Sequence, residues 1–91
     1  PMGEVISKYY LRLIVADRPG VLAAIAGVFG ARGVSIASVI QERTIGDLAE
    51  LVLITHLVRE QNLQDALKAL ADLPVVNEIA SMIRVEGGPS N

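Results

Sequence analysis

The hydrophobic positions of this 91-residue chain fall into four strand-like stretches and two helix-like ones. In the strand-like stretches, apolar residues crowd together or alternate with polar ones, whereas in the helix-like stretches they recur every three or four positions. This pattern predicts strands over residues 8–16, 34–43, 48–58 and 75–86, and helices over residues 19–32 and 60–73. The predicted element order is therefore β-α-β-β-α-β.

The same pattern predicts which side chains are buried. In the first strand, one face should carry Leu11, Leu13 and Val15, and the other Tyr10, Arg12 and Ile14. The first helix should bury the residues at helical spacing, which are Leu22, Ile25, Ala26, Val28 and Phe29. The second should likewise bury Leu63, Ala66, Leu67, Leu70 and Leu73. Gly33 and Pro74 are the expected helix stops, and a turn is expected over residues 44–47.

A short internal repeat supports a chain built of two β-α-β halves. "SIASVIQ" at 35–41 shares Ile-Ala-Ser-x-Ile with "EIASMIR" at 78–84, although chance similarity between two apolar strands is an equal alternative. Two such halves make an α+β, ferredoxin-like fold, with a four-stranded antiparallel sheet and two helices on one face. Residues 51–54 are apolar at every position, so the second face is not consistently polar. We therefore expect another copy, or the rest of a larger protein, to cover part of it or an edge.

Composition and charge exclude several classes of function. The net charge is −2 and the pI about 5.2, and the basic residues are scattered, whereas nucleic-acid and anionic-membrane binders present basic clusters. The longest uncharged run, residues 19–31, is too short to span a bilayer. Cysteine is absent and His56 is the single histidine, which excludes thiolate and multi-histidine metal sites. These features fit a cytoplasmic protein that binds neither nucleic acid nor membrane.

Catalytic chemistry is not expected within this chain. His56 stands alone in a predicted strand, where a structural role is the more frequent one. Glu42, Asp47 and Glu50 flank the predicted turn, so they should be solvated rather than paired in a pocket. No glycine-rich phosphate loop follows a strand, which also argues against an acylphosphatase-like enzyme on this fold. An RNA-binding sheet of this topology would need stacking aromatics on its inner strands, and residues 48–58 contain none.

The stretch "DRPGV" at 17–21 joins the first predicted strand to the first predicted helix. Asp17 is a candidate N-cap that would accept from the backbone N–H of Gly20, with Pro19 in the first turn. The N–H groups of Gly20, Val21 and Leu22 would then be free to bind a carboxylate, while Asp17 could receive an ammonium group. This combination suits an α-amino acid. The alternative, which spacing alone favours, is a well-capped helix without a ligand.

Much of the chain resembles the ACT domain family. "DRPGVLAAIA" and "GVSIASV" follow the general pattern of that family. The start "YYLR", Gln41, "TH" at 55–56 and the ending "IRVE" are more specific, and are similar to the C-terminal regulatory domain of bacterial homoserine dehydrogenases. The likeness runs from Lys8 to Glu86. It implies a lead-in from an upstream catalytic region at 1–7, an ACT regulatory domain over 8–86 and a flexible tail at 87–91.

The resemblance also implies a function and a site. The parent enzyme would interconvert aspartate semialdehyde and homoserine with NAD(P), and this domain, without a cofactor of its own, would mediate feedback inhibition by L-threonine. The effector would lie near an interface in a homodimer or higher oligomer. The implied ligand-binding residues are Asp17, Gly20, Val21, Leu22 and Gln41, with Ser35 and Ser38 from the opposing copy. Asp17 and Ser35 depart from the asparagine that many ACT domains carry. The alternatives are an oligomerisation module that binds no effector and a sensor of another amino acid.

Overall fold

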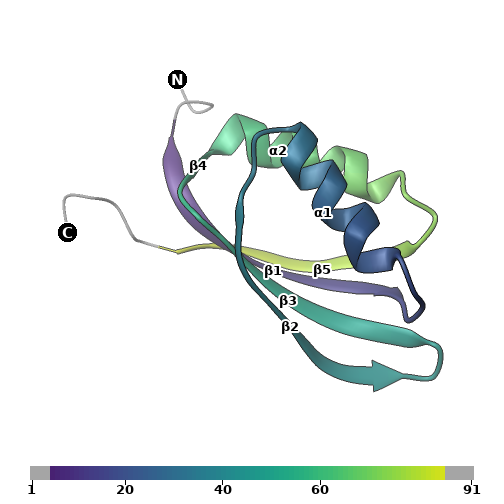
Figure 1. The fold of residues 1–91 in the computed structure, drawn as a ribbon. Coiled ribbons are helices and arrows are strands. Elements are labelled where there is room, and N and C mark those ends of the chain that lie inside the picture. The colour runs from purple at the N-terminus through teal and green to yellow at the C-terminus, as the bar shows by residue number, and fades with distance from the viewer. Residues whose placement is uncertain (1–4, 86–91) are drawn as a thin grey trace.

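One curled antiparallel sheet, covered on a single face by two helices, makes up the computed structural model, which describes residues 5–85 (Figure 1). The elements are β1 (Ile6–Ala16), α1 (Val21–Ala31), β2 (Ile36–Ile45), β3 (Leu48–Thr55), β4 (Val58–Arg59), α2 (Glu60–Ala71) and β5 (Val76–Val85). Strand β1 lies between β3 and β5, β2 pairs with the outer side of β3, and β4 pairs with the start of β1. The predicted β-α-β-β-α-β order and ferredoxin-like fold are confirmed.

Several boundaries differ from the prediction. Strand β1 begins at Ile6 rather than at residue 8, and the predicted strand over 48–58 is divided into β3 and the two-residue β4. Strand β2 spans Ile36–Ile45 rather than 34–43, so the predicted turn over 44–47 is reduced to residues 46 and 47. The helices and β5 are one or two residues shorter than predicted at one or both ends. The predicted tail at 87–91 and most of the predicted lead-in at 1–7 lie outside the described residues.

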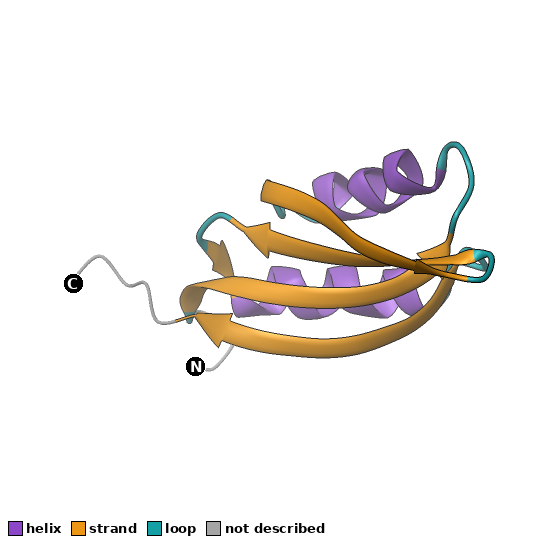
Figure 2. Cartoon of the chain, turned by 90° about the horizontal axis from the view of Figure 1, so that it is seen from below, coloured by secondary structure: helices purple, strands orange, loops and turns teal. Residues whose placement is uncertain are grey.

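The core lies between the sheet and the two helices, which Figure 2 shows together behind the strands. The predicted inward face of β1 is confirmed, since Leu11, Leu13 and Val15 are at most 2% exposed. Burying a side chain of this kind stabilises the fold by about 1.5–3 kcal/mol relative to leaving it in water. The helices contribute Val21, Ile25 and Phe29 from α1 and Leu63, Ala66 and Leu70 from α2.

The predicted buried stripe of α1 is partly wrong. Leu22 is 47% exposed and Ala26 is exposed, whereas Val21 is buried. Because the helix begins at Val21, the residues at i, i+4 and i+8 from that start face the sheet. The end of α1 agrees with the prediction. Gly33 has φ +75°, and the N–H groups of Gly33 and Val34 donate to the carbonyls of Gly30 and Phe29, which together form a Schellman motif.

The break between β3 and β4 is a one-residue slip in their pairing with β1. Tyr10 pairs with Ile54, yet Ser7 pairs with Val58, so an extra residue is accommodated around His56 and Leu57. At this point the backbone N–H of Tyr9 donates to the hydroxyl of Thr55 over 3.0 Å. The His56 N–H donates to the carbonyl of Ser35 instead, which ties the break to the start of β2.

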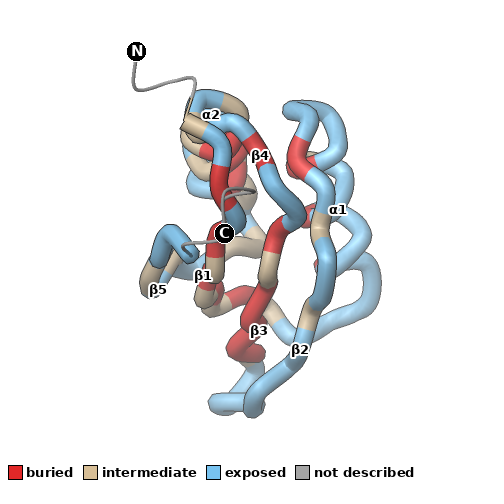
Figure 3. The backbone as a smooth tube through the Cα atoms, turned by 90° about the vertical axis from the view of Figure 1, so that its left-hand side faces the viewer, coloured by how far each residue is buried: buried red, intermediate tan, exposed pale blue. Residues whose placement is uncertain are grey.

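Both edge strands carry irregular pairing. The ladder between β2 and β3 shifts after Ile36 and again after Gln41, and the ladder between β1 and β5 shifts on either side of the pairs made by Leu13 and Ile14. Figure 3 shows that the buried positions gather on β1 and β3, whereas β2 and β5 are mostly exposed or half-buried. The pairing of both outer strands is therefore interrupted by irregularities of the kind that are frequent at the edges of sheets.

The face of the sheet away from the helices is mixed in character. Ile40 and Ile83 are more than half exposed on it. Glu50, expected to be solvated, is instead 5% exposed, because the side chains of Arg12 and Arg43 cover it at 2.6 and 2.7 Å. The hydrogen bond from Arg12 is the main cause that holds the pKa of Glu50 below its ordinary value, and it raises the pKa of Arg12. The prediction for Glu50 was therefore wrong, since the pairing of the strands brings two guanidinium groups to it.

Candidate functional site

The loop between β1 and α1 is a β-turn rather than the first turn of the helix. Gly20 has φ +86° and ψ −13°, follows Pro19, and is closed by a hydrogen bond from the N–H of Val21 to the carbonyl of Arg18. These are the features of a type II turn over residues 18–21, with proline at its second position and glycine at its third. The predicted N-cap role of Asp17 is therefore wrong. The N-cap is Gly20, and no side-chain hydrogen bond caps α1.

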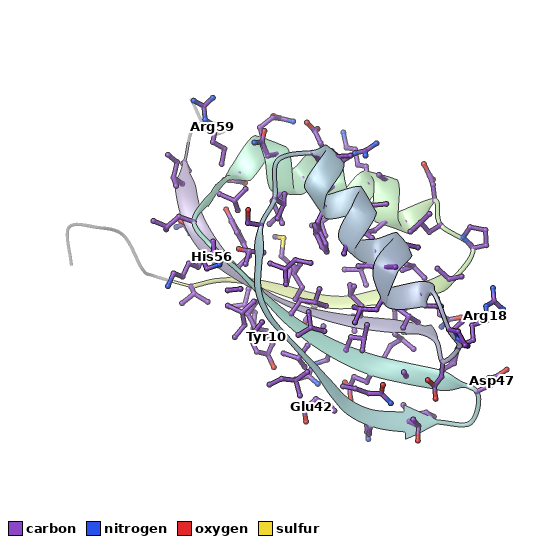
Figure 4. The ribbon with its side chains drawn as sticks, viewed as in Figure 1. Tyr10, Arg18, Glu42, Asp47, His56 and Arg59 are labelled. Atoms are coloured by element: carbon purple, nitrogen blue, oxygen red, sulfur yellow. The ribbon has the colours of Figure 1, made fainter. Side chains whose placement is uncertain are left out.

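The turn leaves donors at the start of α1. The first hydrogen bond of helical type runs from the N–H of Ala24 to the carbonyl of Gly20, so the N–H groups of Leu22 and Ala23 precede it and lack a helical acceptor. The backbone N–H of Asp17 donates to the carbonyl of Asp47 over 3.0 Å. This bond joins the turn to the β2–β3 connection, and Figure 4 shows Arg18 and Asp47 at the same end of the molecule.

A small pocket of about 90 Å³ lies beside this turn. It is lined by Val15, Ala16, Asp17, Arg18, Val21, Leu22, Gln41, Ala49 and Leu51. Val15, Val21, Ala49 and Leu51 are buried and Ala16 is half-buried, whereas Asp17, Arg18, Leu22 and Gln41 are exposed. The pocket therefore has an apolar floor and a rim that carries a carboxylate, a guanidinium and an amide.

Four of the predicted site residues meet at this pocket: Asp17, Val21, Leu22 and Gln41. Gly20 adjoins them in the turn without lining the cavity. Gln41 reaches the pocket because it pairs with Leu51, so its side chain lies on the helix-covered face of the sheet. Its place across from the turn depends on strand pairing and could not be obtained from local spacing.

Ser35 and Ser38 do not join this cluster within one chain. The carbonyl of Ser35 accepts from His56, which Figure 4 shows at the opposite end of the sheet from Arg18. Ser38 pairs with Ile54, whose neighbour in β1 is Tyr10, and so lies on the face away from the helices. Both serines are exposed. If they contribute to this site, they do so from another copy of the chain.

Sequence reasoning missed several lining residues. Arg18 stands inside the motif that was singled out, and its charge beside Asp17 was an available signal. Ala49 and Leu51 carried no such signal, since they are apolar strand residues some thirty positions along the chain. Their contribution follows from the pairing of Ala49 with Val15 and of Leu51 with Leu13.

The pocket has the groups needed to hold a small zwitterion. A carboxylate on the rim suits an ammonium group, and a guanidinium together with free helical N–H groups suits a carboxylate. The apolar floor suits a short side chain. Among residues 5–85 no cluster of three or more His, Cys, Asp or Glu side chains is placed to hold a metal ion. None of the helices described is long and apolar enough to cross a membrane.

A second, larger hollow of about 590 Å³ lies between the helices. It is lined by Ala31, Arg32, Asp65, Lys68, Ala69 and Asp72. Its charged side chains have both signs, and no residue of the predicted site reaches it.

The sequence profile of the ACT domain matches residues 9–75. The chain belongs to the ACT domain family. The match contains β1 from residue 9 onward, the turn, α1, β2 and β3, so it includes every residue that lines the small pocket.

Relatives with known names point to one enzyme. Homoserine dehydrogenase of Mycobacterium tuberculosis is 45% identical over 94 residues, which cover 96% of this chain and 21% of that protein. Homoserine dehydrogenase of Methylobacillus glycogenes is 39% identical over 88 residues, covering 94% of this chain and 21% of the relative. The crystal structure of a homoserine dehydrogenase from Thiobacillus denitrificans superimposes with a TM-score of 0.83 at 35% identity, over 94% of this chain and 19% of that one. The ACT chain thus spans about a fifth of the length of the relatives it matches.

Proposed function

We propose that this chain is the amino-acid-binding regulatory domain of a homoserine dehydrogenase, and that L-threonine is the effector that inhibits the enzyme through it. The parent protein would be a cytoplasmic, NAD(P)-dependent oxidoreductase, with its cofactor and catalytic groups in the part of the enzyme outside these 91 residues. The support for the parent enzyme is the set of homoserine dehydrogenases that match nearly the whole of this chain.

The observation that carries the binding proposal is the pocket beside the β1–α1 turn. It gathers Asp17 and Gln41, which are 24 positions apart, around a cavity with an apolar floor. In the bound state Asp17 accepts from the ammonium group of the amino acid, and Arg18 with the free N–H groups of Leu22 and Ala23 donates to its carboxylate. The side chain points toward the apolar floor, and the Gln41 amide on the rim can hydrogen-bond its hydroxyl. Threonine fits this arrangement because it has both a methyl and a hydroxyl.

The proposal includes a second copy of the chain. Two exposed serines, Ser35 just before β2 and Ser38 within it, are available to a neighbouring molecule. Exposed Ile40 on the same strand offers apolar surface for that contact. A threonine held between two copies stabilises the paired arrangement, and a change in that pairing is what the catalytic part of the enzyme would sense.

Thermal unfolding with and without L-threonine tests the binding proposal. Threonine at 100 times its dissociation constant should stabilise the domain by about 2.7 kcal/mol, whereas D-threonine should give no shift. Asp17→Asn should abolish the shift, and Asp47→Asn, at the adjoining turn but outside the pocket, should retain it. Sedimentation velocity with and without threonine reports the pairing.

The results of these experiments distinguish a threonine sensor from an oligomerisation module and from a sensor of another amino acid. A stable dimer that shows no response to any of the twenty amino acids would favour an oligomerisation module. A response to a different amino acid would identify a sensor of that compound. Inhibition of the full-length enzyme by threonine, lost in the Asp17→Asn variant, would connect the pocket to feedback control.

A further inference from the structure

We propose that Ala49 sets the upper limit on the size of the amino-acid side chain that the pocket accepts. This inference rests on the proposed function, since it concerns the same cavity. It assigns a specificity role to a strand residue that lies outside the turn motif and outside the predicted site.

Ala49 forms part of the floor of the pocket. It is 2% exposed, lies in β3, and pairs with Val15 on one side and with Thr44 on the other. Leu51 lines the pocket two residues further along, so both side chains project from the same face of the strand. That face lies beneath the helices, and the first residue of α1, Val21, lines the cavity from the helix side.

Ala49 has the shortest side chain among the buried residues that line the pocket. Val15, Val21 and Leu51 already carry branched side chains against the cavity. The pocket is small, at about 90 Å³. We therefore expect the short side chains of threonine and valine to fit it better than the longer ones of leucine and phenylalanine. Each carbon added at position 49 would therefore enter space that the ligand needs.

The test compares ligands that differ by one group, on the 91-residue chain. Calorimetric titration with L-serine, L-threonine and L-isoleucine measures how affinity changes as the ligand side chain grows. Ala49→Val adds two methyl groups to the floor, and Ala80→Val adds the same groups at an exposed position on β5 as the matched control. Ala49→Gly removes one methyl group from the floor and so enlarges the cavity.

We expect Ala49→Val to weaken threonine binding about tenfold or more relative to serine binding, because a methyl group in a filled pocket changes affinity by about that factor. Ala49→Gly should raise the affinity for isoleucine relative to threonine, and Ala80→Val should leave all three unchanged. The Ala49→Val chain should still unfold cooperatively, because its new methyl groups fill a void.

Equal changes for serine and threonine in the Ala49→Val chain would overturn the size limit while leaving threonine binding intact. If Ala49→Val fails to fold, the serine, threonine and isoleucine order in Ala49→Gly decides the question by itself, and an unchanged order overturns the inference. If the unmodified chain binds no amino acid, both the proposed function and this inference fail.

Discussion

The hydroxyl of Thr55 accepts a hydrogen bond from the backbone N–H of Tyr9 over 3.0 Å, at the point where the third strand breaks from its pairing with the first. Both residues are at most 1% exposed. A buried N–H needs an acceptor, and the slip in register removes the backbone carbonyl that regular pairing would supply. A side chain on β3 thus completes a backbone ladder.

Replacing Thr55 by valine should destabilise the fold by about 1–3 kcal/mol, because the buried N–H of Tyr9 would lose its acceptor while the shape of the side chain stays nearly the same. Thr55→Ser removes a methyl group but keeps the acceptor. Amide hydrogen exchange distinguishes the two variants. The Tyr9 amide should exchange faster in Thr55→Val and keep its protection in Thr55→Ser, and equal protection in both would show that the hydroxyl is not the acceptor in solution.

The pairing of Glu50 with two arginines should make stability depend on pH. Because the pKa of Glu50 is lowered from its ordinary value of 4.5, the folded state binds this proton less readily than the unfolded state does. The stabilisation is therefore present above about pH 4.5 and is lost as the pH falls through the lowered pKa of the folded state. Glu50→Gln should flatten this part of the profile, as measured by thermal unfolding between about pH 3 and pH 7.

Glu78→Gln is the matched control for that experiment. Glu78 is exposed and pairs with Ile14 on the same face of the sheet, and Ile14 is also the cross-strand partner of Glu50. Its replacement should leave the loss of stability at acidic pH, the acid limb of the profile of stability against pH, unchanged. An unchanged acid limb in Glu50→Gln would mean that other carboxylates govern acid unfolding.

Two glycines of α1 and its turn should respond in opposite directions to alanine. Gly20 has φ +86° and open space around it, so Gly20→Ala should cost about 1–2 kcal/mol through backbone strain alone. Gly27 lies within the helix, also with open space, so Gly27→Ala should stabilise by about 1 kcal/mol. For a domain of this size, about 1 kcal/mol moves the melting temperature by about 4–8 °C. Equal shifts in the two variants would contradict the positive φ at position 20.

Asp17 should matter for binding and little for folding. Because no side chain caps α1, Asp17→Ala should change stability by no more than about 0.5 kcal/mol, rather than the cost of about 1 kcal/mol expected for a lost N-cap. The threonine-dependent rise in melting temperature should disappear in the same variant. A large loss of stability in Asp17→Ala without ligand would show that Asp17 caps α1 after all.

The element order could be predicted because it depends on local patterns. The alternation of Leu11, Leu13 and Val15 predicted the buried face of β1, and the spacing of Leu63, Ala66 and Leu70 predicted that of α2. The turn was mistaken because two local signals compete there. Asp17 favours a cap, but Pro19 and Gly20 occupy the two central positions of a type II turn, which moves the helix start to Val21.

The features that the sequence did not predict depend on contacts between residues that are distant in the chain. Glu50 is covered by Arg12, which is 38 positions away. The sequence near the β2–β3 turn contains no pattern that predicts this contact. The floor of the pocket depends on the register between β1 and β3. A shift of one residue in that pairing would move the floor side chains to the other face of the sheet. The sequence could therefore locate the turn beside the pocket, but not the strand residues that line the pocket opposite that turn.

The irregular ladders at both edges of the sheet bear on how copies of this chain can assemble. A long regular edge would be a template for indefinite addition of strands, which is the geometry of amyloid growth. Here the unbroken pairing is limited to residues 38–41 and 43–45 of β2 and to short runs of β5, the longest being 81–85. A neighbour can join such an edge over a few residues only. Short pairing runs of this kind favour a contact of limited length with a neighbouring strand over the open-ended addition of strands that builds fibrils.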